Sequence, residues 1–87
     1  MTFKPFGNNI LINPKDKGKI IGETATKYLY GEVLEVGDEV KKIKKGDTIG
    51  FTLWGLTELV EDSGVKHYFI QENQDFILGV AENENKA

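Results

Sequence analysis

The chain has 87 residues and a formal net charge of −3, and a chain of this length buries only about 60 to 65% of its surface on folding, so its core is thin. Because it contains no cysteine and only one histidine, a disulfide framework, a thiolate zinc site and a histidine metal cluster are excluded. The acidic balance argues against nucleic acid as a partner, and the lack of a long apolar run or a signal-peptide pattern indicates a cytoplasmic protein that does not bind membranes.

Periodicity predicts short strands along most of the chain. The expected strands, in chain order, cover residues 9–13, 31–36, 48–54, 57–60, 65–70 and 76–80. In TIGFTLW, residues 48–54, Ile49, Phe51 and Leu53 alternate with threonine and glycine, so one face of this strand is expected to be buried. Turn residues at 37–38, 46–47 and 61–64 separate the strands. Many short strands in a small chain favour an all-β, closed or partly closed barrel, and we expect a single domain.

The segment KGKIIGETATKYLY, residues 17–30, does not fit the strand pattern. Ile20 and Ile21 lie between Gly18 and Gly22 in a stretch that is otherwise rich in glycine, threonine and lysine. A loop of about a dozen residues in a compact domain is usually either functional or disordered. Composition leaves two interpretations open: the isoleucines fold back on the barrel as a lid, or they contact a partner.

Four stretches carry a resemblance that covers nearly the whole chain. They are FKPFGNNILINP (3–14), GEVLEVG (31–37), IKKGDTIGF (43–51) and WGLTELVEDSGVKHYFIQENQDFILGV (54–80). In this order they resemble the small co-chaperonins of the GroES type, the ring-shaped lids of chaperonin cages. The resemblance implies one domain over residues 1–87 that forms a small GroES-like, partly closed β-barrel. It also implies a mobile loop at about residues 16–29 and a polar C-terminal tail at residues 81–87.

The implied mobile loop contains the implied chaperonin-binding site. In this family an apolar tripeptide of the loop inserts into a groove on a GroEL-type chaperonin, and nucleotide binds to that partner, so no cofactor is expected here. The implied binding residues are Gly18, Lys19, Ile20, Ile21 and Gly22. Lys19 replaces the usual second glycine and Gly22 replaces the third apolar residue. The anchor is therefore shorter than is typical and is similar to that of some phage-encoded members, which act in the host cytoplasm.

The resemblance also implies a homo-oligomeric ring, a heptamer, in which the first strand of one subunit pairs with the last strand of its neighbour. The implied interface residues are Phe3, Phe6, Phe76, Ile77 and Leu78. The alternative is that these residues only fill the barrel core. Residues 37–46 are too few for the hairpin that roofs the ring in many members, so we expect an open top. The four lysines of KKIKK, residues 41–45, would then lie near the rim or form a solvated turn.

Two other functions are compatible with such a barrel. A similar GEVLEVGDEV…KKGDTI run occurs in the N-terminal domain of medium-chain alcohol dehydrogenases, but this chain has no GxGxxG motif and no cysteine for a catalytic zinc. The second alternative is a monomeric barrel that binds another protein or a ligand. Catalysis is not expected, because His67 lies in a strand pattern and Ser63 lies in a turn with no identifiable base. Trp54 is expected to cap the barrel rather than to stack on a sugar or a base.

Overall fold

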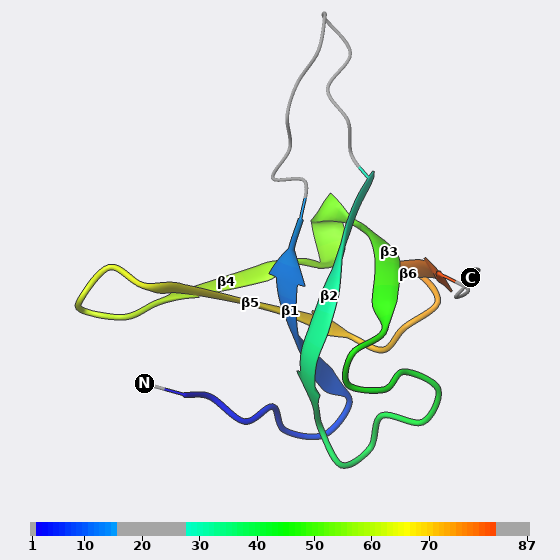
Figure 1. Cartoon of the computed structure of the whole chain (residues 1–87), viewed down its shortest axis with the longest axis horizontal. Helices are drawn as coiled ribbons and strands as arrows, with labels where there is room; N and C mark the ends of the chain where they lie inside the picture. The colour runs from blue at the N-terminus through cyan, green and yellow to red at the C-terminus, as the bar shows by residue number, and fades with distance from the viewer. Residues whose placement is uncertain (1, 16–27, 82–87) are drawn as a thin grey trace, which may run out of the picture.

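The computed structural model of the chain describes residues 2–15 and 28–81. Its elements are β1 (Asn9–Pro14), β2 (Tyr28–Val36), β3 (Thr48–Thr52), the 3₁₀ turn η1 (Leu53–Gly55), β4 (Thr57–Val60), β5 (Lys66–Gln71) and β6 (Ile77–Val80). The strands form one sheet in the order β4-β5-β1-β2-β3-β6, and every neighbouring pair is antiparallel (Figure 1). The predicted all-β, partly closed barrel is confirmed.

The barrel core is small and lies around the central strands β1 and β2. Its eight buried residues are Ile10, Ile12, Leu29, Val33, Ile43, Ile49, Phe51 and Ile70. All but Ile43 come from strands, and Ile43 comes from the loop between β2 and β3. Each such side chain contributes about 1.5–3 kcal/mol when it is fully buried. A core of this size gives a small domain a limited reserve of stability, so added contacts with other chains would matter.

Strand β3 follows the predicted alternation for Ile49 and Phe51, which are both fully buried, but it ends earlier than predicted. Leu53 and Trp54 belong to η1, where they are 48% and 63% exposed, so the predictions that Leu53 continues the buried face and that Trp54 caps the barrel are wrong. The backbone N–H of Thr52 still donates to the carbonyl oxygen of Phe76 at 2.8 Å. The next residues leave the sheet in a 3₁₀ turn, which the backbone N–H of Leu56 closes by donating to the carbonyl oxygen of Leu53 at 3.2 Å.

The two ends of the sheet approach each other where Phe76 packs against Gly55. Gly55 lies just before β4 and Phe76 lies just before β6, the two end strands of the sheet. A Cβ atom built on Gly55 would lie 2.5 Å from Cγ of Phe76, which is far inside contact distance. Gly55 is therefore required for this close packing, which brings the open ends of the barrel together.

We expect Gly55→Ala to lower the free energy of unfolding by about 1–3 kcal/mol, because Phe76 must shift away from the new methyl group. Gly50→Ala is the matched control. Gly50 lies in β3, and a Cβ atom added there would have the Leu29 carbonyl oxygen as its nearest neighbour, at 3.9 Å. That change should be neutral or stabilising by up to about 1 kcal/mol. Urea unfolding of both variants measures the difference, and equal stabilities would contradict this role of Gly55.

Candidate assembly interface

Residues 2–6, which we call the N-terminal segment, are extended but pair with no strand among the described residues. Side chains along the segment alternate between two environments. Phe3 is half-buried and Pro5 is buried, whereas Lys4 is exposed and Phe6 is 85% exposed. One face of the segment therefore packs on its own barrel, and the other face presents Phe6 to solvent.

A tight turn fixes the direction in which Phe6 is presented. The side-chain amide and the backbone N–H of Asn9 both donate to the carbonyl oxygen of Phe6, at 2.8 and 3.0 Å. Gly7 has a φ of +60°, a conformation that favours glycine. A Cβ atom on Gly37 would lie 2.1 Å from the Gly7 carbonyl oxygen, so the turn also rests directly on the backbone after β2. The exposed Phe6 is thus held on a rigid support.

Strand β6 is an open edge of the sheet, since it pairs only with β3 in the described residues. Leu78 is 60% exposed and Val80 is 41% exposed, while Phe76 and Ile77 are half-buried and pack against the core. The N-terminal segment and β6 lie on opposite sides of the molecule (Figure 1). The molecule therefore carries an unpaired extended segment on one side and the open edge of β6 on the other, so these two elements do not pair within a single chain. Strand β4, at the other end of the sheet, also pairs with only one strand among the described residues.

The five predicted interface residues fall into two groups. Phe6 and Leu78 are mainly exposed and are available to a neighbouring chain. Phe3, Phe76 and Ile77 are half-buried in contacts within their own chain, as the alternative of core packing also predicts. Sequence alone did not distinguish these two groups. It also did not single out Val80, which is exposed on β6 as Leu78 is.

A carboxylate clamp holds the lysine-rich loop beside β6. The backbone N–H groups of Lys41, Lys42 and Ile43 donate to the carboxylate of Glu72 at 2.9, 2.6 and 3.2 Å. The loop and β6 line a groove of about 550 Å³ that includes Leu78 and Val80. Glu72 thus fixes one wall of the groove beside the open edge. The sequence carried no local signal for this role, because Glu72 and the loop are far apart in the chain.

Two opposing effects act on the pKa of Glu72. Burial disfavours its charged form, but the hydrogen bonds from the three backbone N–H groups favour that form and outweigh burial. The pKa of Glu72 is therefore held below its ordinary value. Because this pKa is lower in the folded than in the unfolded chain, the carboxylate stabilises the fold above the unfolded pKa, and this stabilisation is lost as pH falls through the folded pKa.

The predicted chaperonin-binding residues Gly18, Lys19, Ile20, Ile21 and Gly22 lie outside the described residues. The structure does show where their segment is attached. Strands β1 and β2 pair as far as Pro14 and Gly31, and the backbone N–H of Lys15 donates to the Tyr30 carbonyl oxygen at 2.9 Å. The predicted loop extended to residue 29, but Leu29 is part of β2 and is buried. The segment thus leaves from, and returns to, two firmly paired strands.

Ser63, Glu61 and His67 form a polar cluster in the β4–β5 hairpin. Ser63 Oγ donates to Glu61 Oε1 at 3.4 Å, and Nε2 of His67 lies 2.5 Å from Glu61 Oε2. The carboxylate lies between the serine and the histidine, so His67 is not placed to accept a proton from Ser63, as nucleophilic catalysis would require.

Residues 2–15 and 28–81 contain no group of three or more potential metal ligands, and no helix among them is long and apolar enough to cross a membrane.

These features define a class of small β-barrel that presents an unpaired extended segment on one side and the open edge strand β6 on the other. No protein-family model matches the chain. It is 38% identical to the co-chaperonin GroES of Campylobacter curvus, over 92% of this chain and 98% of that protein. It is 34% identical to the co-chaperonins GroES of Campylobacter jejuni and of a Sulfurovum species, with the same coverage. The chain therefore belongs to the GroES co-chaperonin family, as its motifs predicted.

We expect Glu72→Gln to lower the free energy of unfolding by about 1–2 kcal/mol at neutral pH, because an amide nitrogen cannot accept the donated hydrogen bonds. The difference from the wild type should shrink as pH falls through the lowered pKa of Glu72, since the wild-type carboxyl is then also neutral. Urea unfolding across a pH series, at one protein concentration, measures this difference.

Glu35→Gln is the control for this measurement, because Glu35 pairs with Lys45 Nζ at 3.2 Å in a solvated ion pair. Its loss should change the free energy of unfolding by no more than about 1 kcal/mol. A Glu72→Gln effect that is equally large at acid pH would show that the carboxylate charge is not its cause.

Proposed function

We propose that this chain is a co-chaperonin that assembles into a heptameric ring, caps a GroEL-type chaperonin in the presence of nucleotide and closes a chamber for protein folding in the cytoplasm. The observation that carries the proposal is the near full-length similarity to proteins named co-chaperonin GroES. The mechanism is non-catalytic: nucleotide binds to the chaperonin, and this chain supplies the lid.

The open edge and the N-terminal segment support the ring. An extended segment can add to an open sheet edge through main-chain hydrogen bonds. Here the two elements differ from each other and lie on opposite sides of the molecule (Figure 1). Their pairing is therefore head-to-tail, and head-to-tail contacts generate closed rings or open filaments rather than two-fold dimers. In a closed ring, the N-terminal segment of every subunit pairs with β6 of its neighbour, so no copy of either element remains unpaired.

Energetics explain why the lid should be a ring. Burying Ile20 and Ile21 would contribute roughly 3–6 kcal/mol per subunit, whereas ordering about five backbone residues costs roughly 5–10 kcal/mol. One loop alone would bind weakly. In a ring, every contact after the first is intramolecular and benefits from a high effective concentration. Several weak contacts also allow the lid to dissociate in each cycle.

The loop between β2 and β3 supports an open top for the proposed ring. Residues 37–47 form turns and no strand, and Glu72 holds residues 41–43 against the barrel. No hairpin therefore extends from this loop to cover the ring centre. Electron-microscopy projections of the ring should show a central hole, and density across the hole would contradict the open top.

We expect replacement of both Ile20 and Ile21 by serine to abolish nucleotide-dependent binding to a GroEL-type chaperonin without changing the mass of the ring. The reason is that the two proposed apolar anchors are lost, while the proposed interface elements, residues 2–6 and β6, are unchanged. Co-sedimentation with chaperonin, with and without ATP, measures binding. Chaperonin binding by the double variant at the wild-type level would show that these residues are not the anchor.

We expect Phe6→Ser and Leu78→Ser each to dissociate the ring, because each change removes about 1.5–3 kcal/mol of apolar burial at every subunit contact. Leu34→Ser is the matched control: Leu34 is 38% exposed on the central strand β2, which pairs with β1 and β3 and with neither interface element. Sedimentation velocity measures the mass. A wild-type protein with the 9.8 kDa mass of one chain would favour the alternative, a monomeric barrel that binds a protein or a ligand.

A further inference from the structure

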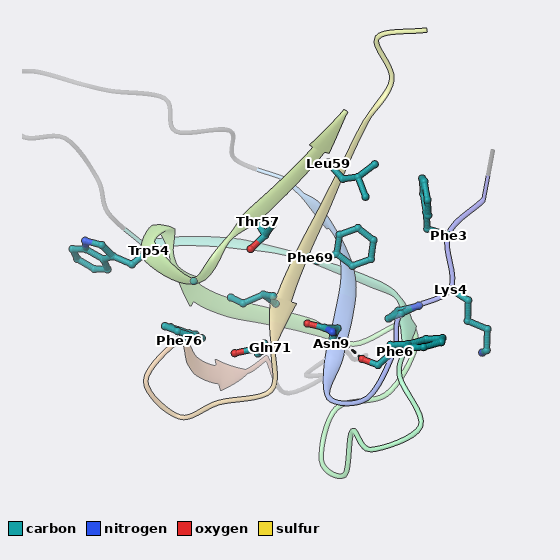
Figure 2. Close-up of a pocket in the computed structure, with 13 residues that line it drawn as sticks. Phe3, Lys4, Phe6, Asn9, Trp54, Thr57, Leu59, Phe69, Gln71 and Phe76 are labelled. Atoms are coloured by element: carbon teal, nitrogen blue, oxygen red, sulfur yellow. Dashed lines mark hydrogen bonds between the residues drawn. The ribbon is translucent and has the colours of Figure 1, made fainter. Parts of the chain in front are cut away.

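The N-terminal segment is attached to the outer face of the β4–β5 hairpin through one aromatic side chain. The Phe3 ring lies edge-on to His67, with ring centroids 4.7 Å apart, and to Phe69, with centroids 6.4 Å apart. Both interplanar angles are 77°. His67 and Phe69 are alternate residues of β5 and so point to the same face, and Figure 2 shows Phe3 beside Phe69 and Leu59.

A hydrogen bond fixes the orientation of the His67 ring. Its Nε2 atom lies 2.5 Å from Oε2 of Glu61, and the two side chains are only 14% and 11% exposed. Glu61 in turn lies at the hairpin turn, where its backbone N–H donates to the Val65 carbonyl oxygen at 2.8 Å. The edge-to-face geometry of an aromatic pair depends on ring orientation. The turn carboxylate therefore sets the ring against which Phe3 packs.

We propose that His67 and Glu61 are positioning residues for ring assembly, which hold Phe3 so that the N-terminal segment is presented to the neighbouring subunit. This inference rests on the proposed ring. The segment is tethered at both ends, by Phe3 on the hairpin and by the Asn9 turn near β1. Phe6 lies between these tethers and is 85% exposed. A segment held in its binding conformation loses less entropy on association, so the tether raises affinity without touching the neighbour.

The same contact links assembly to pH. The hydrogen bond from His67 is the main cause that holds the pKa of Glu61 below its ordinary value. Because the pKa is lowered in the folded chain, the contact is intact above the unfolded pKa and is lost as pH falls through the folded pKa.

Other polar and charged groups lie near the His67–Glu61 pair. Ser63 and Asp62 share the hairpin turn with Glu61, and the Ser63 hydroxyl donates to Glu61. Lys66 and Glu58 form their own ion pair at 3.7 Å. They lie on the opposite face of the hairpin from His67, because side chains alternate along β5 and its partner strand β4. In the N-terminal segment, Lys4 is exposed.

The test compares two changes in the same hairpin. His67→Ala removes both the bond to Glu61 and the contact with Phe3. Tyr68→Phe is the matched control, because it removes a hydrogen bond across the opposite face of the hairpin, from Tyr68 Oη to Glu58 Oε2 at 3.2 Å. Sedimentation velocity over a dilution series gives the concentration at which half of the rings have dissociated. We expect this concentration to rise about ten-fold or more for His67→Ala and to stay within about two-fold of the wild type for Tyr68→Phe.

A pH series and a second variant separate positioning from general loss of structure. Glu61→Gln keeps an acceptor for His67 but cannot be titrated, so its assembly should depend less on acid pH than that of the wild type. Phe3→Leu keeps an apolar side chain but should shift the NMR signals of the His67 ring, which lies next to the Phe3 ring in the wild type. This variant should also weaken assembly.

The outcomes are distinct. Rings of His67→Ala and Phe3→Leu that are as stable as the wild type would overturn the inference and leave the proposed ring intact. Equal weakening by His67→Ala and Tyr68→Phe would also overturn it, because the effect would then belong to the hairpin in general. A wild-type chain that sediments as a single subunit would overturn the proposed ring first, and this inference with it.

Discussion

Main-chain hydrogen bonding in the described barrel is incomplete in residues 2–6 and along the two end strands of the sheet, β4 and β6, and this constraint shapes the rest of the molecule. Residues 2–6 are extended without a partner, and β6 pairs on one side only. The two elements lie on opposite sides (Figure 1), so one chain cannot join them. Open edges promote association, and natural proteins cover them. In the proposed ring, each chain covers its neighbour's edge, so the main-chain groups that one barrel leaves unpaired are the groups that join the subunits.

Rigid supports surround both of these elements. Asn9 and the close approach of Gly37 to Gly7 fix the turn behind Phe6, while Glu72 fixes the loop beside β6. None of these supports adds apolar area to an interface. In the proposed ring, they limit the conformations of the free chain and so lower the entropy cost of association. A small barrel with a thin core can in this way form specific contacts without a large apolar surface.

The predicted chaperonin-binding segment is attached to the best-paired part of the sheet. Its ends continue from β1 and β2, which supply much of the core and pair as far as Pro14 and Gly31. Binding residues are often placed on loops that a rigid scaffold positions. The proposed lid separates two tasks in this way: the barrel edges determine how subunits join, and the segment between β1 and β2 determines what the ring binds.

Local patterns in the residues were enough to predict where the strands lie, though not all of their ends, and the resemblance of four stretches predicted the family. Ile49 and Phe51 show a period of two that identifies a half-buried strand without knowledge of its neighbours. Long-range packing decided what those patterns missed. Thr52, the last residue of β3, donates to the carbonyl oxygen of Phe76, which is distant in the chain. Likewise, the carboxylate of Glu72 binds the backbone of a loop that precedes it by some thirty positions.

The same limit applies to the interface residues. Phe3 and Phe6 are both aromatic residues of one short segment, yet Phe3 packs on the hairpin and Phe6 faces solvent. The order of strands in the sheet and the Asn9 turn decide which face of the segment meets the barrel. Burial depends on the elements that surround a residue in space, and only the tertiary structure brings those elements together.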